Sequence, residues 1–269
     1  MSEVQWIVLA LIQGFTEFLP ISSSGHLILP EQLLHWPRQG LAFDVAVHLG
    51  SLLAVVIYFR KDIVAMTMNW SLSLMKKPHD VHLARLSWFI VLGTVPAVIF
   101  GALLKDVIET VVRDNSVLII ACTTVIFGLL LWYADHKAKQ QHTLSDLTLK
   151  SVVWIGFAQA VALIPGTSRS GITMTAGLMV GLKKADAARF SFLLSIPIIL
   201  AAGLLISLDI VQSTEQFDFS ALIYGSVISF FSALACIVLF LKWIERAGFL
   251  PFVIYRLILG AILFFVYFS

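Results

Sequence analysis

Most of the side chains in this sequence that could do chemistry lie in two short segments. The first runs from Gln13 to His26 and contains Glu17, the serines Ser22, Ser23 and Ser24, and Gly25. Gln13 and Glu17 are four residues apart, so on a helix they share one face. This segment therefore gathers a carboxylate, three hydroxyls and an imidazole along a few turns of chain.

The second segment, which starts at Pro165, adds a cation. Its one arginine, Arg169, lies among small and hydroxyl-bearing residues. These are Gly166, Thr167, Ser168, Ser170 and Thr173.

Together the two segments suit a phosphate ester. Arginine binds phosphate oxygens bidentately, and Gly and Ser turns that begin helices present backbone N–H groups to an anion. A hydroxyl or an imidazole can attack phosphorus when a base is close. A carboxylate can be that base, or it can hold Mg²⁺ or Ca²⁺ through oxygen.

Each residue also has a structural interpretation. Small residues such as Ser168 and Ser170 often allow close helix packing in membranes. Glu17 would then be only an ion-pair partner of Arg169, and His26 would cap a short helix. The joint occurrence of these residues at two breaks in apolar sequence favours the functional interpretation.

Three more ionisable residues lie within apolar runs. Asp44 and His48 are consistent with a position near one membrane interface. Arg256 follows Pro251 by five residues, which is consistent with a side chain that extends to the other interface. Under this interpretation none of the three belongs to the site.

The composition excludes a soluble enzyme. Of the 269 residues, 59% are hydrophobic and 13% charged, and the mean hydropathy is +0.94. A soluble domain has about 45–50% apolar and about 25% charged residues. The net charge of +2 is too small to suggest nucleic-acid binding. The chain is therefore predicted to be a polytopic membrane protein in contact with the lipid bilayer.

Helical crossings of the bilayer need about 20 apolar residues each. Six runs meet that length: 41–59, 86–104, 115–134, 190–208, 219–241 and 248–268. Two other apolar regions, 4–35 and 152–182, are broken by Pro, Gly and Ser and predict re-entrant helical hairpins. The predicted fold is an all-α polytopic membrane protein with six transmembrane helices and two re-entrant hairpins.

The orientation follows from the basic residues, which concentrate in cytoplasmic loops. Connections 60–85, 135–150, 183–189 and 242–246 are rich in Lys and Arg. Connection 209–218 is acidic without a basic residue, and 105–114 is mixed. Both termini are then outside, the first hairpin opens outward and the second inward.

The two halves of the chain resemble each other. Gln13 with the break at Pro20 recurs as Gln159 with the break at Pro165, and Gly93-Thr-Val-Pro recurs as Gly248-Phe-Leu-Pro. Within one membrane domain, 1–269, the repeats span about 1–135 and 150–269 and hold three crossings each. Because three is odd, they form an inverted-topology repeat, whose site is expected near the bilayer midplane.

The first motif, from Gln13 to His26, resembles the (E/Q)xxxE motif with following serines and histidine of bacterial undecaprenyl-diphosphate phosphatases, the bacitracin-resistance family. The second, from Pro165 to Thr173, resembles that family's PGxSRSxxT motif. The resemblance covers the whole chain.

The resemblance implies an enzyme of the bacterial inner membrane that removes the terminal phosphate of undecaprenyl diphosphate. This reaction recycles the lipid carrier of peptidoglycan synthesis and confers bacitracin resistance. The resemblance also implies a divalent metal, Mg²⁺ or Ca²⁺, and a site open to the periplasm. Gln13 takes the glutamine option of the motif, which leaves Glu17 as its main metal-binding or proton-handling group.

On this basis the catalytic residues are Ser23, His26, Glu17 and Arg169, and the metal ligands are Glu17 and Gln13. The substrate-binding residues are Ser22, Ser24, Gly25, Gly166, Thr167, Ser168, Ser170 and Thr173.

In the favoured mechanism Ser23 attacks phosphorus, and His26 or Glu17 takes its proton. In the rival mechanism His26 attacks. A lipid-carrier flippase or secondary transporter with an anion site is the alternative function, because inverted repeats are common in transporters. A homodimer is compatible with the size of the chain, but no sequence feature indicates its interface.

Overall fold

The computed structural model describes residues 2–37, 40–104, 117–207, 210 and 217–268, and the backbone alone of residues 105–114, 116, 208–209 and 211–212. These residues form eleven α-helices, one short 3-10 helix and one isolated β-bridge, and they contain no strand. The prediction of an all-α protein is confirmed.

Among the described residues, six helices are long and apolar enough to cross a membrane, and each overlaps one predicted crossing. They are α3 (Leu41–Tyr58), α5 (Val81–Asp114), α6 (Ser116–Lys137), α9 (Lys184–Gln212), α10 (Phe219–Ala247) and α11 (Leu250–Phe268). Large apolar side chains such as Leu204 and Ile223 project from this bundle with more than half of their surface exposed. Lipid covers such side chains in a membrane protein.

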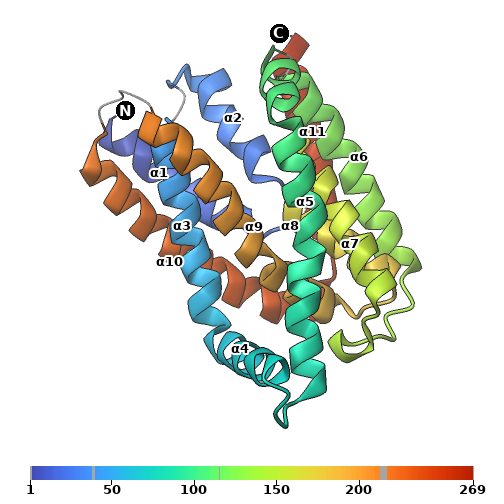
Figure 1. Ribbon diagram of the computed structural model, residues 1–269. Coiled ribbons are helices and arrows are strands. Elements are labelled where there is room, and N and C mark those ends of the chain that lie inside the picture. Colours follow the sequence, from blue (N-terminus) through green and yellow to red (C-terminus); the bar gives the residue numbers. More distant parts are fainter. Residues whose placement is uncertain (1, 38–39, 115, 213–216, 269) are drawn as a thin grey trace.

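Two short helices, α1 (Glu3–Glu17) and α2 (Ser23–Leu34), form the first broken segment. At 1.5 Å per residue they are about 22 and 18 Å long, less than the hydrocarbon thickness of about 30 Å. A tight turn joins them, and α2 returns toward the end of the molecule at which α1 begins (Figure 1).

The second broken segment has the same organisation. It consists of α7 (Leu149–Val161) and α8 (Arg169–Met179), joined by a turn in the middle of the bundle (Figure 1). The β-bridge joins His142, which precedes α7, to Leu182, which follows α8. Helix α7 therefore begins at the same end of the molecule at which α8 finishes.

The region 60–85, expected as a connection, contains a further helix, α4 (Arg60–Leu74). It packs on the beginning of α5, where the rings of Trp70 and Trp88 meet edge to face at 5.5 Å. Asn69 accepts a hydrogen bond from the backbone of Asp80 and so closes the turn between the helices. Polar residues interrupt the apolar pattern of α4, so it is too polar to be read as a crossing.

Most of the basic connections gather at one end of the bundle, the lower end in Figure 1. Lys184 pairs with Asp135 at 2.9 Å, and Asp135 also accepts a hydrogen bond from the backbone of Phe249. Arg189 pairs with Asp62 at the beginning of α4. We call this end, with residues 60–80, 135–149, 181–189 and 242–250, the basic end.

Small residues allow the helices to approach closely. A Cβ atom on Gly50 of α3 would lie 2.2 Å from the carbonyl oxygen of Ser226 on α10. Beside this contact, the hydroxyls of Ser51 and Ser229 lie 2.8 Å apart. Such contacts between small residues hold membrane helices together where the hydrophobic effect cannot.

Candidate active site

The turn between α1 and α2 is shaped by Ser22. Its backbone has φ +74°, and its hydroxyl accepts a hydrogen bond from the N–H of Gly25 at 3.3 Å and contacts the hydroxyl of Ser24 at 3.0 Å. The side chain thus caps the new helix in place of a missing backbone carbonyl. This positions Ser23 as the first residue of α2.

The turn between α7 and α8 repeats this geometry. Ser168 has φ +69°, and its hydroxyl accepts from the N–H of Gly171 at 3.1 Å and contacts Ser170 at 3.2 Å. Arg169 is the first residue of α8 and occupies the position that Ser23 has in the first turn. The similarity of the two motifs therefore corresponds to one local structure used twice.

The two turns also contact each other. The backbone N–H of Gly166 donates to the hydroxyl of Ser24 at 3.0 Å, and the hydroxyl of Ser170 donates to the carbonyl of Leu19 at 2.8 Å. The α1–α2 turn and the α7–α8 turn, about 145 residues apart in the sequence, are thus hydrogen-bonded to each other inside the bundle.

The predicted charged pair meets at this junction. Arg169 donates to one oxygen of Glu17 at 2.8 Å. The other oxygen accepts from the amide of Gln13 at 3.0 Å and from the hydroxyl of Ser23 at 3.3 Å. The ring of Phe18 lies against the guanidinium, and its centre is 5.8 Å from Cζ of Arg169. The carboxylate of Glu17 is therefore hydrogen-bonded to both a guanidinium and a hydroxyl.

A cavity of about 890 Å³ opens over this cluster. Its polar wall includes Gln13, Glu17, Ser22, Ser23, Ser24, Gly166, Ser168 and Arg169. Much of the remaining wall is apolar and comes from α5, α6 and α9, with residues such as Ala97, Ile120 and Ile199. A cavity with one polar wall and otherwise apolar walls suits an amphiphilic ligand.

Asp44 and His48 of α3 line the same cavity, so the interpretation that places them outside the site is wrong. The imidazole Nε2 of His48 lies 3.8 Å from a carboxylate oxygen of Glu17. One oxygen of Asp44 is buried without a hydrogen-bond partner. Their spacing of four residues within an apolar run was the sequence signal for a shared helix face.

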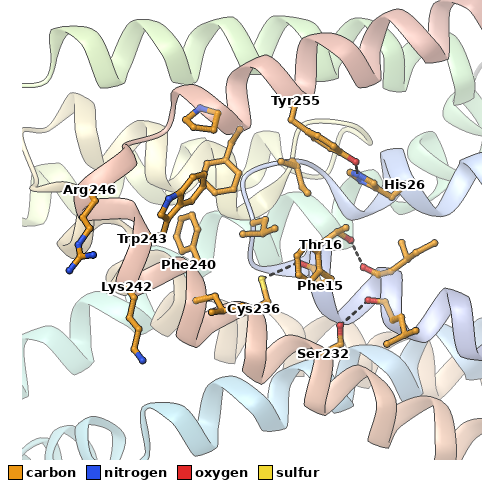
Figure 2. Close-up of a pocket in the computed structure, with 17 residues that line it drawn as sticks. Phe15, Thr16, His26, Ser232, Cys236, Phe240, Lys242, Trp243, Arg246 and Tyr255 are labelled. Atoms are coloured by element: carbon orange, nitrogen blue, oxygen red, sulfur yellow. Dashed lines mark hydrogen bonds between the residues drawn. The ribbon is translucent and has the colours of Figure 1, made fainter.

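The structure does not bring His26 into this cavity. Its Nδ1 lies 2.7 Å from the carbonyl oxygen of Ser22, and its Nε2 lies 2.7 Å from the hydroxyl of Tyr255 (Figure 2). Since a carbonyl only accepts, Nδ1 carries the proton, and in the neutral ring Nε2 accepts from the tyrosine. Both ring nitrogens are therefore occupied on the far side of the turn.

Four of the predicted substrate-binding residues lie behind the cavity wall. The hydroxyl of Thr173 donates to the carbonyl of Arg169 at 2.8 Å and contacts Ser191 at 2.7 Å. Ser170 is committed to Leu19, as described above. Gly25 and Thr167 do not line the cavity either. In this structure these four residues shape the turns and do not face the cavity.

The interpretation of Arg256 as a residue that reaches an interface is wrong. Its side chain is fully buried, and five backbone carbonyl oxygens surround the guanidinium. They belong to Thr124 (3.0 Å from Nε), Pro20 and Thr167 (3.3 and 3.0 Å from Nη1), and Thr123 and Gly166 (3.4 and 3.0 Å from Nη2). Arg256 thus links both turns to α6, a role for which the sequence offers only an arginine in an apolar run.

The oxygens beside Glu17 could take part in holding a divalent cation. The amide oxygen of Gln13 is buried and has no hydrogen-bond partner. Within the described residues, no three His, Cys, Asp or Glu side chains are grouped so that they could hold an ion alone. Mg²⁺ often binds through one or two carboxylates together with substrate phosphates and water. The donor set fits a metal shared with a bound phosphate.

Comparison with known proteins identifies the family. Residues 6–262 match the family described as "Bacitracin resistance protein BacA". The chain is 62% identical over 257 residues to an undecaprenyl-diphosphatase of Alteromonas mediterranea, with 96% of each chain covered. It is 60% identical over 262 residues to undecaprenyl-diphosphatase 1 of Pseudoalteromonas translucida, with 97% of each chain covered. A third relative, the undecaprenyl-diphosphatase of Chromohalobacter salexigens, is 54% identical over 257 residues, with 96% of each chain covered.

Both predicted motifs, and the cavity that they build, lie within the matched residues. The six long apolar helices agree with this assignment. This multi-pass membrane protein belongs to the bacitracin resistance protein BacA family.

Proposed function

We propose that this protein hydrolyses undecaprenyl diphosphate to undecaprenyl phosphate and inorganic phosphate. The observation that carries the proposal is the cluster of Ser23, Glu17 and Arg169, assembled from two turns in a cavity with apolar walls. Three relatives at 54–62% identity bear the name of this activity. The reaction removes the diphosphate form of the lipid carrier and so supports resistance to bacitracin.

Arg169 binds the terminal phosphate in this proposal. Its guanidinium now pairs with Glu17, but its fork geometry matches phosphate equally well. In this proposal, backbone N–H groups in the first turns of α2 and α8 add to the anion site. When a diphosphate takes over Arg169, the carboxylate of Glu17 becomes available as a base.

Ser23 is the proposed nucleophile. Its hydroxyl donates to Glu17, so the proton passes to that carboxylate while the serine oxygen forms a bond to the terminal phosphorus. The bond from phosphorus to the bridging oxygen breaks, and undecaprenyl phosphate leaves. Water then cleaves the phosphoserine and releases inorganic phosphate. His26 is proposed to position Ser22 and the turn, because neither of its nitrogens is free to reach the substrate.

A divalent cation, Mg²⁺ or Ca²⁺, is proposed to bind at Glu17 and the free amide oxygen of Gln13. Such an ion supplies positive charge that stabilises the transferring phosphate. The carboxamide of Gln13 also holds Glu17 in place through its N–H group.

In the membrane, α1–α2 and α7–α8 are proposed to be re-entrant hairpins of an inverted repeat. The matched geometry of Ser22 and Ser168 supports this arrangement, as do the short helices and their opposite openings. The basic end is proposed to face the cytoplasm of a bacterial inner membrane. The cavity then opens toward the periplasm.

The test is phosphate release from undecaprenyl diphosphate by the purified protein in detergent with Mg²⁺, Ca²⁺ or EDTA. We expect release that needs metal and falls on the order of 10³-fold in Glu17→Gln, Arg169→Ala and Ser23→Ala. Ser71→Ala, which removes an exposed hydroxyl on α4, is the control and should keep full activity.

Two results would contradict parts of this proposal. Failure of the folded wild-type protein to release phosphate under all metal conditions would remove the hydrolase and favour lipid transport. Turnover by Ser23→Ala at the wild-type rate would exclude the phosphoserine. Conversely, phosphate from a labelled substrate that is trapped on Ser23 in acid-quenched enzyme would identify the nucleophile directly.

A further inference from the structure

A second hollow lies on the other side of the α1–α2 turn from the candidate active site. It is a groove of about 900 Å³ between α1, α10 and α11, and it shares no lining residue with the active-site cavity (Figure 2). Its inner end is formed by Thr16, Leu19 and the stacked rings of His26 and Tyr255. The groove therefore touches the back of the turn whose front carries Glu17 and Ser23.

The long sides of this groove are apolar and open sideways. Phe15 is 50% exposed, Leu239 62% and Tyr255 44%, and all three lie on the lipid-facing surface of the bundle. A groove of this kind in a membrane protein is filled by hydrocarbon, because water there would leave apolar walls exposed. The body of the groove thus fits a lipid chain.

One end of the groove is cationic. Lys242 and Arg246 are one helical turn apart on α10, and both lie at the end of the groove nearest the basic end (Figure 2). In the part of the chain that the structure describes, neither side chain forms an ion pair or a hydrogen bond. Trp243, next to Lys242 in the sequence, also lines the groove, and tryptophan is typical of the level of lipid head groups.

We propose that this groove binds an anionic phospholipid from the leaflet at the basic end. One acyl chain runs along α10 toward His26, and the phosphate lies between Lys242 and Arg246. Basic residues between helices at this level of a membrane attract anionic head groups. A zwitterionic phospholipid offers the same chain but less net negative charge, so the cationic end selects against it.

A bound chain would support the catalytic turn from behind. Thr16 and Leu19 are already packed, but Tyr255 and the exposed ring of Phe15 leave space next to His26. Hydrocarbon in that space adds dispersion contacts to residues that hold Ser22. The lipid therefore acts as a positioning element for the turn and does not enter the reaction.

Binding can be measured by native mass spectrometry of the detergent-purified protein with added phosphatidylglycerol or phosphatidylcholine. We expect the wild type to retain phosphatidylglycerol preferentially and Lys242→Ala/Arg246→Ala to lose that preference, on the order of tenfold. The matched control, Lys137→Ala/Lys139→Ala, removes two exposed charges from the same end of the molecule. It should keep the preference for phosphatidylglycerol. Equal loss in both double variants, or none in the first, would overturn the proposal.

The position of the chain can be tested with a phosphatidylglycerol that carries a photoactivatable diazirine on one acyl chain. Adducts are expected on α10 between residues 232 and 246, and on the facing surfaces of α1 and α11. Adducts spread evenly over all lipid-facing helices, including α5 and α7, would exclude a defined groove site.

The effect on catalysis rests on the proposed phosphatase activity. In nanodiscs, replacing phosphatidylglycerol by phosphatidylcholine should lower phosphate release by the wild type several-fold. The same replacement should leave phosphate release by Lys242→Ala/Arg246→Ala unchanged. Lipid binding without any effect on release would remove the positioning role but leave the site. Absence of release in every lipid would contradict the proposed function and not the binding.

Discussion

At the scale of single residues, the two arginines at the junction of the turns are compensated in different ways. Arg169 pairs with the carboxylate of Glu17. Arg256 is surrounded by backbone carbonyl oxygens, and in the described part of the structure no carboxylate pairs with it. Carbonyl dipoles solvate a guanidinium but do not cancel its charge. The junction of the two turns therefore keeps a positive field, which favours a diphosphate.

Arg256 is predicted to be required for the assembly of both turns. Arg256→Met removes the guanidinium donors from the buried turn carbonyls of Pro20, Gly166 and Thr167, at about 1–3 kcal/mol for each one left unsatisfied. Arg256→Lys keeps the charge but cannot reach all of these acceptors. We expect Arg256→Met to unfold in detergent at a clearly lower temperature than Arg256→Lys, and we expect both variants to have reduced activity. Wild-type unfolding temperature in Arg256→Met would contradict this role.

The contact between His26 and Tyr255 allows the role of the imidazole to be tested without altering it. Tyr255→Phe keeps the stacked ring and removes only the hydroxyl at 2.7 Å. If His26 positions the turn, kcat should fall less than about tenfold, as for the loss of one hydrogen bond of about 1 kcal/mol. Steady-state kinetics would show this, and Ser23→Ala is the comparison. A loss as large as that of Ser23→Ala would instead point to His26 as a catalytic group.

At the scale of elements, the turns are the feature that the chain uses twice. Ser22 and Ser168 adopt positive φ values and cap the next helix with their own hydroxyls. A non-glycine residue with positive φ is uncommon and costs free energy unless its surroundings support it. Here the support comes from the opposite turn, through Gly166 and Ser24. The two hairpins are therefore expected to fold interdependently.

Gly166 is predicted to tolerate no side chain. Its φ is +85°, and a Cβ atom would lie 2.0 Å from the hydroxyl of Thr123 and 2.7 Å from the carbonyl of Ile120. Gly166→Ala should separate the second turn from α6 and lower both stability and activity. Gly101→Ala on α5 is the control, because its Cβ would meet only Leu163, at 3.5 Å. Equal unfolding temperatures for the two variants would contradict this packing argument.

At the scale of the whole molecule, two hollows approach one turn from opposite ends of the bundle. The active-site cavity includes residues at the beginning of α3, whereas the groove includes residues at the end of α10. The turn between them is thin, since His26 and Ser22 are hydrogen-bonded neighbours across it. This arrangement allows lipid on one side to influence chemistry on the other without a path for water or substrate.

The orientation of the bundle can be tested with two matched cysteines. Ser220→Cys lies at the beginning of α10 and Ser145→Cys lies at the basic end, and both serines are exposed. In intact cells a membrane-impermeant maleimide should label Ser220→Cys, and it should label Ser145→Cys only after the cells are permeabilised. Background from Cys236 is expected to be small because that side chain is buried. The reverse pattern would place the cavity on the cytoplasmic side.

Sequence alone determined the features that depend on local pattern. Helix length and apolar content predicted all six membrane-length helices, because transfer into lipid is a property of each segment by itself. The two Pro-Gly-Ser breaks were predicted because they interrupt such segments. The position of Gln13 and Glu17 on one helix face was predicted from their spacing of four residues. Helix α4 was missed because its apolar residues are too few to stand out as a segment.

Only the tertiary structure decided where the side chains at the breaks point. Ser23 contacts Glu17 whereas His26 contacts Tyr255, although the two residues are only three apart on α2. The contact between Glu17 and Arg169 joins positions 152 residues apart. The burial of Arg256 depends on carbonyls from three separate segments. No local pattern encodes such contacts, since they exist only when distant helices pack together.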